Sequence, residues 1–300
     1  MNKFEQDAFD CAADINQALD NLLTTDQLSG PGPAPVRLLA AIRHGTLNGG
    51  KRLRPLMVRQ TAAIFSLPPE QTLSAGMAVE MVHCYSLIHD DLPAMDDDDV
   101  RRGKPSVHKA FDEATAILAG DALLTHAFGV LANPACHPNS EVRSSLINEL
   151  VSGAGVGGMA GGQALDIDGE NSTISDQGIA TIQQMKTGAL IRAAVRMGAI
   201  LGGASKDDLE ALTIYTQAAG RAFQLADDIL DETATTEQMG KKTGKDKDRG
   251  KPTLVTSIGV DAARRHLGDT IHNAVSALTP FGKEADGLRA TAKYFGARQS

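Results

Sequence analysis

The sequence contains no tryptophan and only three cysteines among its 300 residues. Cys11, Cys84 and Cys136 are odd in number and have no Cys-x-x-Cys spacing. This cysteine usage argues against a disulfide scaffold and favours a reducing compartment. We accordingly expect a cytoplasmic protein.

Long apolar runs and an excess of positive charge are also missing. The nearest candidate for a membrane span, residues 188–204, is interrupted by Arg192 and Arg196, so no span is expected. Residues 1–20 have the pattern of a polar amphipathic helix rather than of a signal peptide. The formal net charge of −8 argues against nucleic acid or an anionic membrane as the main partner.

Helical periodicity extends over nearly the whole chain, whereas strand-type alternation is rare. No internal repeat and no domain boundary are evident, so we expect one all-α domain, residues 1–300, with about ten helices. The segment 69–92 is apolar almost all round and should be the central helix. The expected helices cover residues 3–28, 36–48, about 51–65, 69–92, 109–132, 141–166, 175–202 and 206–231, and two more follow a polar loop at 232–251.

An acidic stripe lies on the last of the long helices. Gln224, Asp227, Asp228 and Asp231 have the i, i+3, i+4, i+7 spacing that brings side chains to one helix face. Carboxylates on an otherwise apolar helix are costly unless they meet cations. The stripe therefore predicts a metal site, and the alternative is an ordinary solvated helix end.

A second acidic cluster, residues 89–99, follows the central helix. Asp90 and Asp91 end that helix, and Pro93 separates them from Asp96, so the chain must bulge to aim all three carboxylates at one ion. Oxygen ligands at this density suit Mg²⁺. Asp98 and Asp99 are expected to be solvated, and Asp97 has no assigned role.

Basic residues with the chemistry of a phosphate site accompany these clusters. Arg101 and Arg102 offer guanidinium groups that bind phosphate oxygens bidentately, or they only neutralise the aspartates. Residues 49–55 form a glycine-opened basic turn before a helix, which favours anions but lacks the P-loop spacing. Lys241 and Lys251 lie in the polar loop, which could close over phosphate, whereas Lys242, Lys245 and Lys247 are expected to be solvated.

Two further positions on helices are ambiguous from sequence. His83 lies two helical turns before Asp90, where a lone histidine is more often a core residue than a functional one. Lys186 and Thr187 lie in a helix of small residues, where a kink would direct a carbonyl and a hydroxyl into a cavity.

Taken in chain order, these residues resemble the trans-isoprenyl diphosphate synthases. The resemblance extends from residue 49 to residue 252, and the two extra residues before Asp96 together with Tyr85 are similar to the bacterial farnesyl diphosphate synthase subgroup. The landmarks are residues 49–55, His83, residues 90–96, residues 101–103, residues 161–163, residues 186–188, residues 223–231 and residues 250–252.

The resemblance implies a helical bundle around a deep central cavity, a homodimer, and three Mg²⁺ ions when substrate is bound. It implies Mg²⁺-dependent condensation of isopentenyl diphosphate with dimethylallyl and geranyl diphosphate to farnesyl diphosphate. The implied metal ligands are Asp90, Asp96, Asp227, Asp91 and Asp231. The implied substrate-binding residues are Lys51, Arg54, His83, Arg101, Arg102, Lys186, Lys241 and Lys251. Lys186, Thr187 and Gln224 would stabilise the carbocation, and Tyr85 with Ser86 would set the product length.

Four other interpretations stay open at this point. A synthase of the longer geranylgeranyl diphosphate is one of them, because only Tyr85 bears on the product length. A helical His-Asp metal phosphohydrolase would use His89 and His44, but it does not explain the acidic stripe at residues 227–231. A terpene cyclase would need no second basic pocket. A non-catalytic partner subunit is disfavoured because both acidic motifs are complete.

Overall fold

The computed structural model describes residues 1–169, 175–233, 255 and 258–297. This part of the chain is helical except for a hairpin of two short antiparallel strands, so the expected all-α class is confirmed. Its α-helices are α1 (Lys3–Leu22), α2 (Thr25–Leu28), α3 (Val36–Leu47), α4 (Leu53–Ile64), α5 (Leu73–Asp90), α6 (Val107–Ala110), α7 (Glu113–Ala132), α8 (Ser140–Ala154), α9 (Met159–Gly169), α10 (Asp176–Gln183), α11 (Ala189–Leu201), α12 (Lys206–Thr233), α16 (Val260–Ala277) and α17 (Asp286–Gly296). The remaining elements are the short helices η1 (Pro69–Thr72) and η3 (Thr279–Ala285), the π-helical turn η2 (Gln184–Gly188), and strands β1 (Val100–Arg101) and β2 (Lys104–Pro105).

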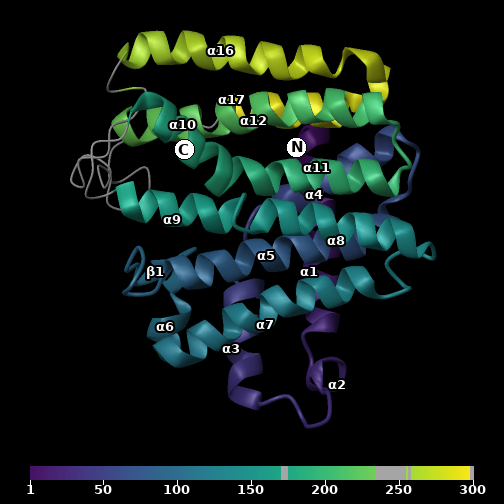
Figure 1. The fold of residues 1–300 in the computed structure, drawn as a ribbon, viewed down its shortest axis with the longest axis vertical. Helices are drawn as coiled ribbons and strands as arrows, with labels where there is room; N and C mark the ends of the chain where they lie inside the picture. The colour runs from purple at the N-terminus through teal and green to yellow at the C-terminus, as the bar shows by residue number, and fades with distance from the viewer. Residues whose placement is uncertain (170–174, 234–254, 256–257, 298–300) are drawn as a thin grey trace.

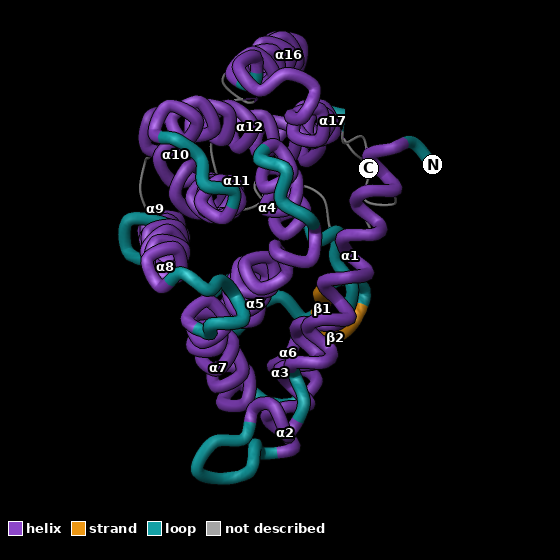
Figure 2. Tube along the Cα trace, turned by 90° about the vertical axis from the view of Figure 1, so that its right-hand side faces the viewer, coloured by secondary structure: helices purple, strands orange, loops and turns teal. Residues whose placement is uncertain are grey.

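The long helices lie in successive layers. Figure 1 shows α16 at one edge, followed by α12 with α17, then α11 with α4, then α8 and α9, then α5, and finally α7 and α3. Seen from the side, α1 runs across the ends of this stack (Figure 2). The packing partners agree with this order, because α5 contacts α4, α7 and α11, while α12 contacts α11, α16 and α17. The two acidic segments are therefore carried by helices from different layers.

Helix α5 occupies the centre of the bundle, as its composition predicts. Its buried residues include Val79, Met81 and Val82, all without exposed surface. Gly76 allows α1 to approach closely, because a Cβ at this position would lie 2.8 Å from Cδ1 of Ile15. Burial of an apolar helix on several sides at once fixes its end, where Asp90 lies, relative to the rest of the fold.

Several expected helix segments differ from the structure: 69–92 is η1 followed by α5, which ends at Asp90, and the helix expected at 109–132 begins at Glu113. Three further segments are interrupted for a local reason. The segment 141–166 is two helices, because glycines 155, 157 and 158 interrupt it between α8 and α9. The segment 3–28 divides at Thr24, whose hydroxyl accepts a hydrogen bond from the Gln27 amide and caps α2. The segment 175–202 contains the π-helical turn η2, so it is α10 and α11 rather than one regular helix.

The strand pair is an element that the periodicity did not indicate. Val100 pairs with Pro105 and Arg101 with Lys104. The connecting residues Arg102 and Gly103 have φ of 54° and 73°, as a two-residue type I′ turn requires. The hairpin gives the segment after α5 a defined shape where a charged loop was expected.

Helix α7 is long and apolar enough to cross a membrane by length and composition alone. A third of its most hydropathic window is buried in the fold, where α7 packs against α5 and α3. Core helices satisfy the same criterion, so one such helix is weak evidence for a span. The expected absence of a membrane span stays a prediction.

Candidate active site

The acidic stripe lies on α12, which continues as a regular helix past Asp231 to Thr233. Asp228 is its buried member, with 6% of its surface exposed, and its carboxylate accepts hydrogen bonds from Nε2 of Gln224 at 3.0 Å and of Gln183 at 3.3 Å. Asp227 and Asp231 are half-buried. The two amides hold Asp228 in place, so Asp227 and Asp231 are better placed for a cation that enters from solvent.

The first acidic cluster folds back on itself after α5, as the two extra residues require. The amide of Asp96 donates to the carbonyl oxygen of Asp90 at 2.8 Å, which brings the backbone of these two residues together across Pro93. Burial raises the pKa of Asp90 to about 6, Lys186 opposes this rise, and Asp96 adds to it. Asp96 and Lys186 are therefore both close enough to Asp90 to influence its charge.

Asp91 has a different environment from its neighbour Asp90. It is buried, and both Nε and Nη2 of Arg101 donate to its carboxylate, the Nε–Oδ1 distance being 2.9 Å. Arg101 also pairs with Asp98 at 3.4 Å, so the expectation that Asp98 is a solvated charge is wrong. Burial opposes the charge of Arg101, but the hydrogen bond and the charge of Asp91 outweigh it and raise the pKa of Arg101. This geometry favours Asp91 as the residue that holds Arg101, rather than as a metal ligand.

The basic turn 49–55 meets the hairpin that carries Arg102. Gly49 and Gly50 have φ of 88° and 119°, and the Arg102 guanidinium donates to the carbonyl oxygen of Gly49. A Cβ at Gly50 would lie 2.7 Å from Cζ of Arg102. The positive φ favours glycine at position 50, and the missing side chain leaves room for the Arg102 guanidinium in its present position.

His83 and Arg54 lie near Arg102 in the same region. Burial lowers the pKa of His83 well below 6.5, and the charges of Arg54 and Arg102 lower it further. Burial likewise lowers the pKa of Arg54, and the charge of Arg102 contributes to the shift. Two guanidinium groups, those of Arg54 and Arg102, are thus clustered around a neutral His83, and such a cluster attracts anions. Lys51, which was also predicted to bind substrate, is exposed, and its Nζ lies 5.5 Å from the ring centre of Tyr294.

Lys186 lies in η2, the irregular turn that corresponds to the expected kink. Its Nζ pairs with Oδ2 of Asp166 on α9 at 2.8 Å. Gly162 permits the contact between the two segments, since a Cβ there would collide with the backbone of Lys186. Sequence reasoning missed Asp166, although an acidic residue one helical turn after Gly162 was a usable signal. Thr187 is half-buried in the same turn.

Tyr85 lies on α5 with its ring half-buried and at 5.8 Å from the ring of His89 in an edge-on contact. Burial raises the pKa of Tyr85, and the charge of Asp90 adds to the rise. The neighbouring Ser86 donates its hydroxyl to the carbonyl oxygen of His83 at 3.0 Å. Tyr85 is therefore close to the first acidic cluster, whereas the hydroxyl of Ser86 is engaged with its own helix.

A cleft opens beside these groups, between α3, the end of α5 and the hairpin. Its lining includes Asn48, Leu87, Asp91, Arg101 and Arg102. The wall of this narrow cleft combines the guanidinium groups of Arg101 and Arg102 with the carboxylate of Asp91. Lys241 and Lys251, predicted to belong to a closing loop, and Lys242, Lys245 and Lys247, predicted to be solvated, lie outside the described residues.

Comparison with known proteins gives extensive similarity. The family model "Polyprenyl synthetase" matches residues 35–283. Farnesyl diphosphate synthase of Escherichia coli K12 is 42% identical over 299 residues, which is 97% of each chain. The Micrococcus luteus farnesyl diphosphate synthase is 42% identical over 280 residues, 93% of this chain and 96% of the relative. The crystal structure of an FPP/GFPP synthase from Zymomonas mobilis is 41% identical with a TM-score of 0.86, covering 98% of this chain and 99% of that one.

Proposed function

Because the chain belongs to the polyprenyl synthetase family and is a prenyltransferase, we propose that it makes farnesyl diphosphate by Mg²⁺-dependent condensation of isopentenyl diphosphate with dimethylallyl and geranyl diphosphate. The support for this product is the name that relatives at about 40% identity share over nearly the whole chain. The observation in the structure that carries the proposal is the proximity of Asp90, Asp96 and Lys186, which combines carboxylates for metal with a cation for diphosphate.

The donor set of the two acidic segments fits Mg²⁺. Asp90, Asp96, Asp227 and Asp231 offer only carboxylate oxygens, and all four are half-buried. Three ions are expected with substrate bound. Magnesium held there would neutralise the negative charge that develops on the diphosphate leaving group.

Lys186 and Arg101 would bind the same leaving group directly. Each is already held by an acidic partner, Lys186 by Asp166 and Arg101 by Asp91. A cation fixed in this way need not reorganise when the allylic carbon–oxygen bond ionises, and this pre-organisation lowers the barrier. Their fixed positions would also orient the allylic tail relative to the second substrate.

Isopentenyl diphosphate would bind at the basic cluster of Arg54, His83 and Arg102, with Lys51 and the closing-loop lysines Lys241 and Lys251 added from outside. His83 is neutral at ordinary pH because its pKa is well below 6.5, so it would contribute a hydrogen bond and not a charge. The guanidinium groups would provide the charge. This second basic cluster distinguishes a condensing enzyme from a terpene cyclase.

The allylic cation would be stabilised by dipoles rather than by a base. Gln224 donates its amide NH₂ to Asp228, so its carbonyl oxygen is directed away from that bond. Thr187 and the carbonyl of Lys186 lie in η2, where the helical pattern of hydrogen bonds is altered. The cation is then attacked by the double bond of isopentenyl diphosphate, and the released diphosphate takes the proton.

A homodimer and a cytoplasmic location stay predictions.

The function is tested by incubating the purified protein with Mg²⁺, labelled isopentenyl diphosphate, and either dimethylallyl or geranyl diphosphate. We expect farnesyl diphosphate as the main product from both allylic substrates, identified by chromatography of the dephosphorylated products. A longer main product would favour the geranylgeranyl alternative. Hydrolysis without condensation, or cyclisation of the allylic substrate, would overturn the proposal.

Replacement of Tyr85 by alanine is expected to lengthen the product. Tyr85 is five residues before Asp90, roughly 7–8 Å along the helix axis, so its ring would be the floor that stops the growing tail. The majority of the product should shift from farnesyl to geranylgeranyl diphosphate or longer. Tyr85→Phe, which keeps the ring, should retain the product length. An unchanged distribution in Tyr85→Ala would exclude this floor.

A further inference from the structure

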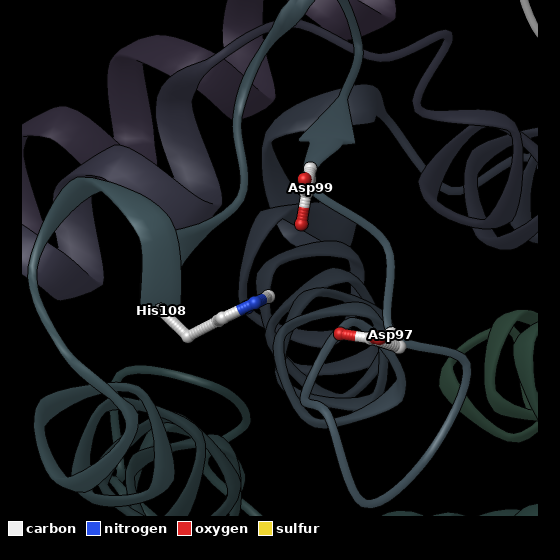
Figure 3. A group of neighbouring side chains, drawn as sticks. All are labelled: Asp97, Asp99 and His108. Carbon is white, nitrogen blue, oxygen red and sulfur yellow. The ribbon is translucent and has the colours of Figure 1, made fainter.

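Three side chains outside the proposed diphosphate site converge beside the hairpin. Asp97 and Asp99 belong to the segment between α5 and β1, and His108 lies on α6. Each offers one ligand atom, and these atoms all lie within 4.8 Å of one another. Figure 3 shows the ring edge of His108 directed toward the space between the two carboxylates. None of the three has a role in the proposed condensation.

His108 supplies an observation that is independent of the acidic residues. Only 7% of its surface is exposed, and its Nδ1 is hydrogen-bonded to Oγ of Ser106 at 3.1 Å. Its Nε2 is buried and has no hydrogen-bond partner among the residues that the structure describes. Such an atom is costly to leave without a ligand. If Nδ1 carries the proton and donates it to Ser106, Nε2 presents a lone pair, as in metal-binding histidines.

The exposed carboxylates complete a mixed nitrogen and oxygen donor set. Asp97 has φ of 49°, a left-handed conformation that aspartate tolerates better than most residues. Oδ1 of Asp99 is 2.9 Å from Nζ of Lys109, which already supplies one positive charge at this position. A metal ion would compete with Lys109 for that carboxylate. The amide of Ser106 donates to the carbonyl oxygen of Asp99 at 2.9 Å, so the backbone of the two segments is joined independently of any ion.

We propose that Asp97, Asp99 and His108 form a site for a divalent transition-metal ion of the Zn²⁺ type. An imidazole nitrogen with carboxylates suits such ions, whereas the carboxylate-only set of the active site suits Mg²⁺. Two ligand atoms of one tetrahedral Zn²⁺ ion lie about 3.4 Å apart, closer than the 4.8 Å within which these three atoms now lie, so the exposed aspartates would rotate inward to complete the site. The ion would fasten the segment that carries Asp96 to helix α6 and would thereby brace the hairpin that presents Arg101 and Arg102.

The proposal is tested with Zn²⁺ itself, without substrate and in excess Mg²⁺. Equilibrium dialysis should give one bound equivalent of Zn²⁺ for the unaltered protein. Asp97→Asn and Asp99→Asn should each weaken this binding at least about 10-fold, because each removes one charged ligand. Both positions are exposed, so folding should be retained. Glu113→Gln is the matched control, since it removes an equal charge near Lys109 but no ligand atom, and it should bind like the unaltered protein.

A second measurement identifies the nitrogen. In the long-range ¹H–¹⁵N spectrum of the histidine rings, Zn²⁺ should shift Nε2 of His108, assigned by its disappearance in His108→Gln. Lys109→Gln should strengthen Zn²⁺ binding several-fold by removing the competing charge from Asp99. The proposal is overturned by unchanged affinity in both aspartate variants, by Zn²⁺ binding that leaves His108 unshifted, or by the absence of a bound equivalent.

Discussion

The Asp227→Asn variant is expected to turn over at least about 10³-fold more slowly than the unaltered protein at saturating substrate. The substitution keeps the size of the side chain and removes its charge. Asp227 is half-buried on the regular part of α12, so the helix should be retained. What is lost is one of the carboxylates proposed to hold the metal ions that neutralise the leaving diphosphate. The measurement is kcat with labelled isopentenyl diphosphate and geranyl diphosphate.

The matched control for Asp227→Asn is Glu210→Gln on the same helix. Glu210 is exposed near the start of α12, so this variant also loses one negative charge but leaves the acidic stripe intact. It should retain near-normal kcat, and both variants should have the circular dichroism spectrum of the unaltered protein. Raising Mg²⁺ should recover part of the activity of Asp227→Asn if metal binding is the step affected. Near-normal turnover of Asp227→Asn at ordinary Mg²⁺ would refute the ligand assignment.

The α12 stripe could be predicted from sequence because a regular helix converts spacing into geometry. Four polar positions at i, i+3, i+4 and i+7 must share a face wherever the helix continues, and it continues to Thr233. The same reasoning placed the end of the central helix at residue 92, two residues beyond the observed end of α5 at Asp90, and anticipated that the chain would bulge between Pro93 and Asp96. These features depend on local rules alone.

The pairing of Asp91 with Arg101 could not be predicted in the same way. It depends on the hairpin, whose strands of two residues each are too short to give an alternating pattern. The turn signal was also obscured, because Arg102 takes a left-handed φ that arginine rarely adopts. Without the hairpin, the charged segment after α5 looked like a solvated loop, and Asp98 was wrongly expected to be exposed to water.

The ion pair between Lys186 and Asp166 illustrates a second limit. The apolar pattern continues through the glycines between α8 and α9, so periodicity alone indicated one long helix. The break between α8 and α9 changes the direction of α9 and therefore the face on which Asp166 lies. The contact between α9 and η2 was accordingly missed, although Asp166 one helical turn after Gly162 was a signal for it.

Arg52 is the residue whose importance was least evident from sequence. It lay within the basic turn 49–55, of which only Lys51 and Arg54 were expected to bind substrate, and no role was predicted for it. In the structure its side chain is fully buried, Nη1 donates to Oε1 of Glu80 at 2.6 Å, and Nη2 donates to the carbonyl oxygen of Thr46 at 2.6 Å. Burial opposes the charge of Arg52, but Glu80 outweighs it and raises the pKa of Arg52. With φ of 48°, Arg52 also turns the chain so that α4 begins at the next residue.

Replacement of Arg52 by methionine is therefore expected to reduce the free energy of unfolding by about 3–5 kcal/mol. Methionine fills much of the volume but leaves Glu80, only 2% of whose side chain is exposed, as a buried charge without its partner. Urea unfolding followed by circular dichroism measures the loss. Asp14→Asn, which breaks the more exposed pair between Asp14 and Arg59, should cost no more than about 1 kcal/mol.

The double variant Arg52→Met with Glu80→Leu separates two effects of Arg52: neutralising the buried charge of Glu80, and holding the turn that leads into α4. Removing both charges should restore most of the lost stability, since a buried ion pair replaced by apolar groups is often neutral. The turn that leads into α4 would still lack the anchoring bonds of Arg52 to Thr46 and Asn16. Because Arg54 lies in the first turn of α4, the KM for isopentenyl diphosphate should stay raised several-fold in the stable double variant. Normal stability together with a normal KM in the double variant would limit Arg52 to a structural role. A double variant that is as unstable as Arg52→Met would show that the buried charge of Glu80 is not the cause of the lost stability.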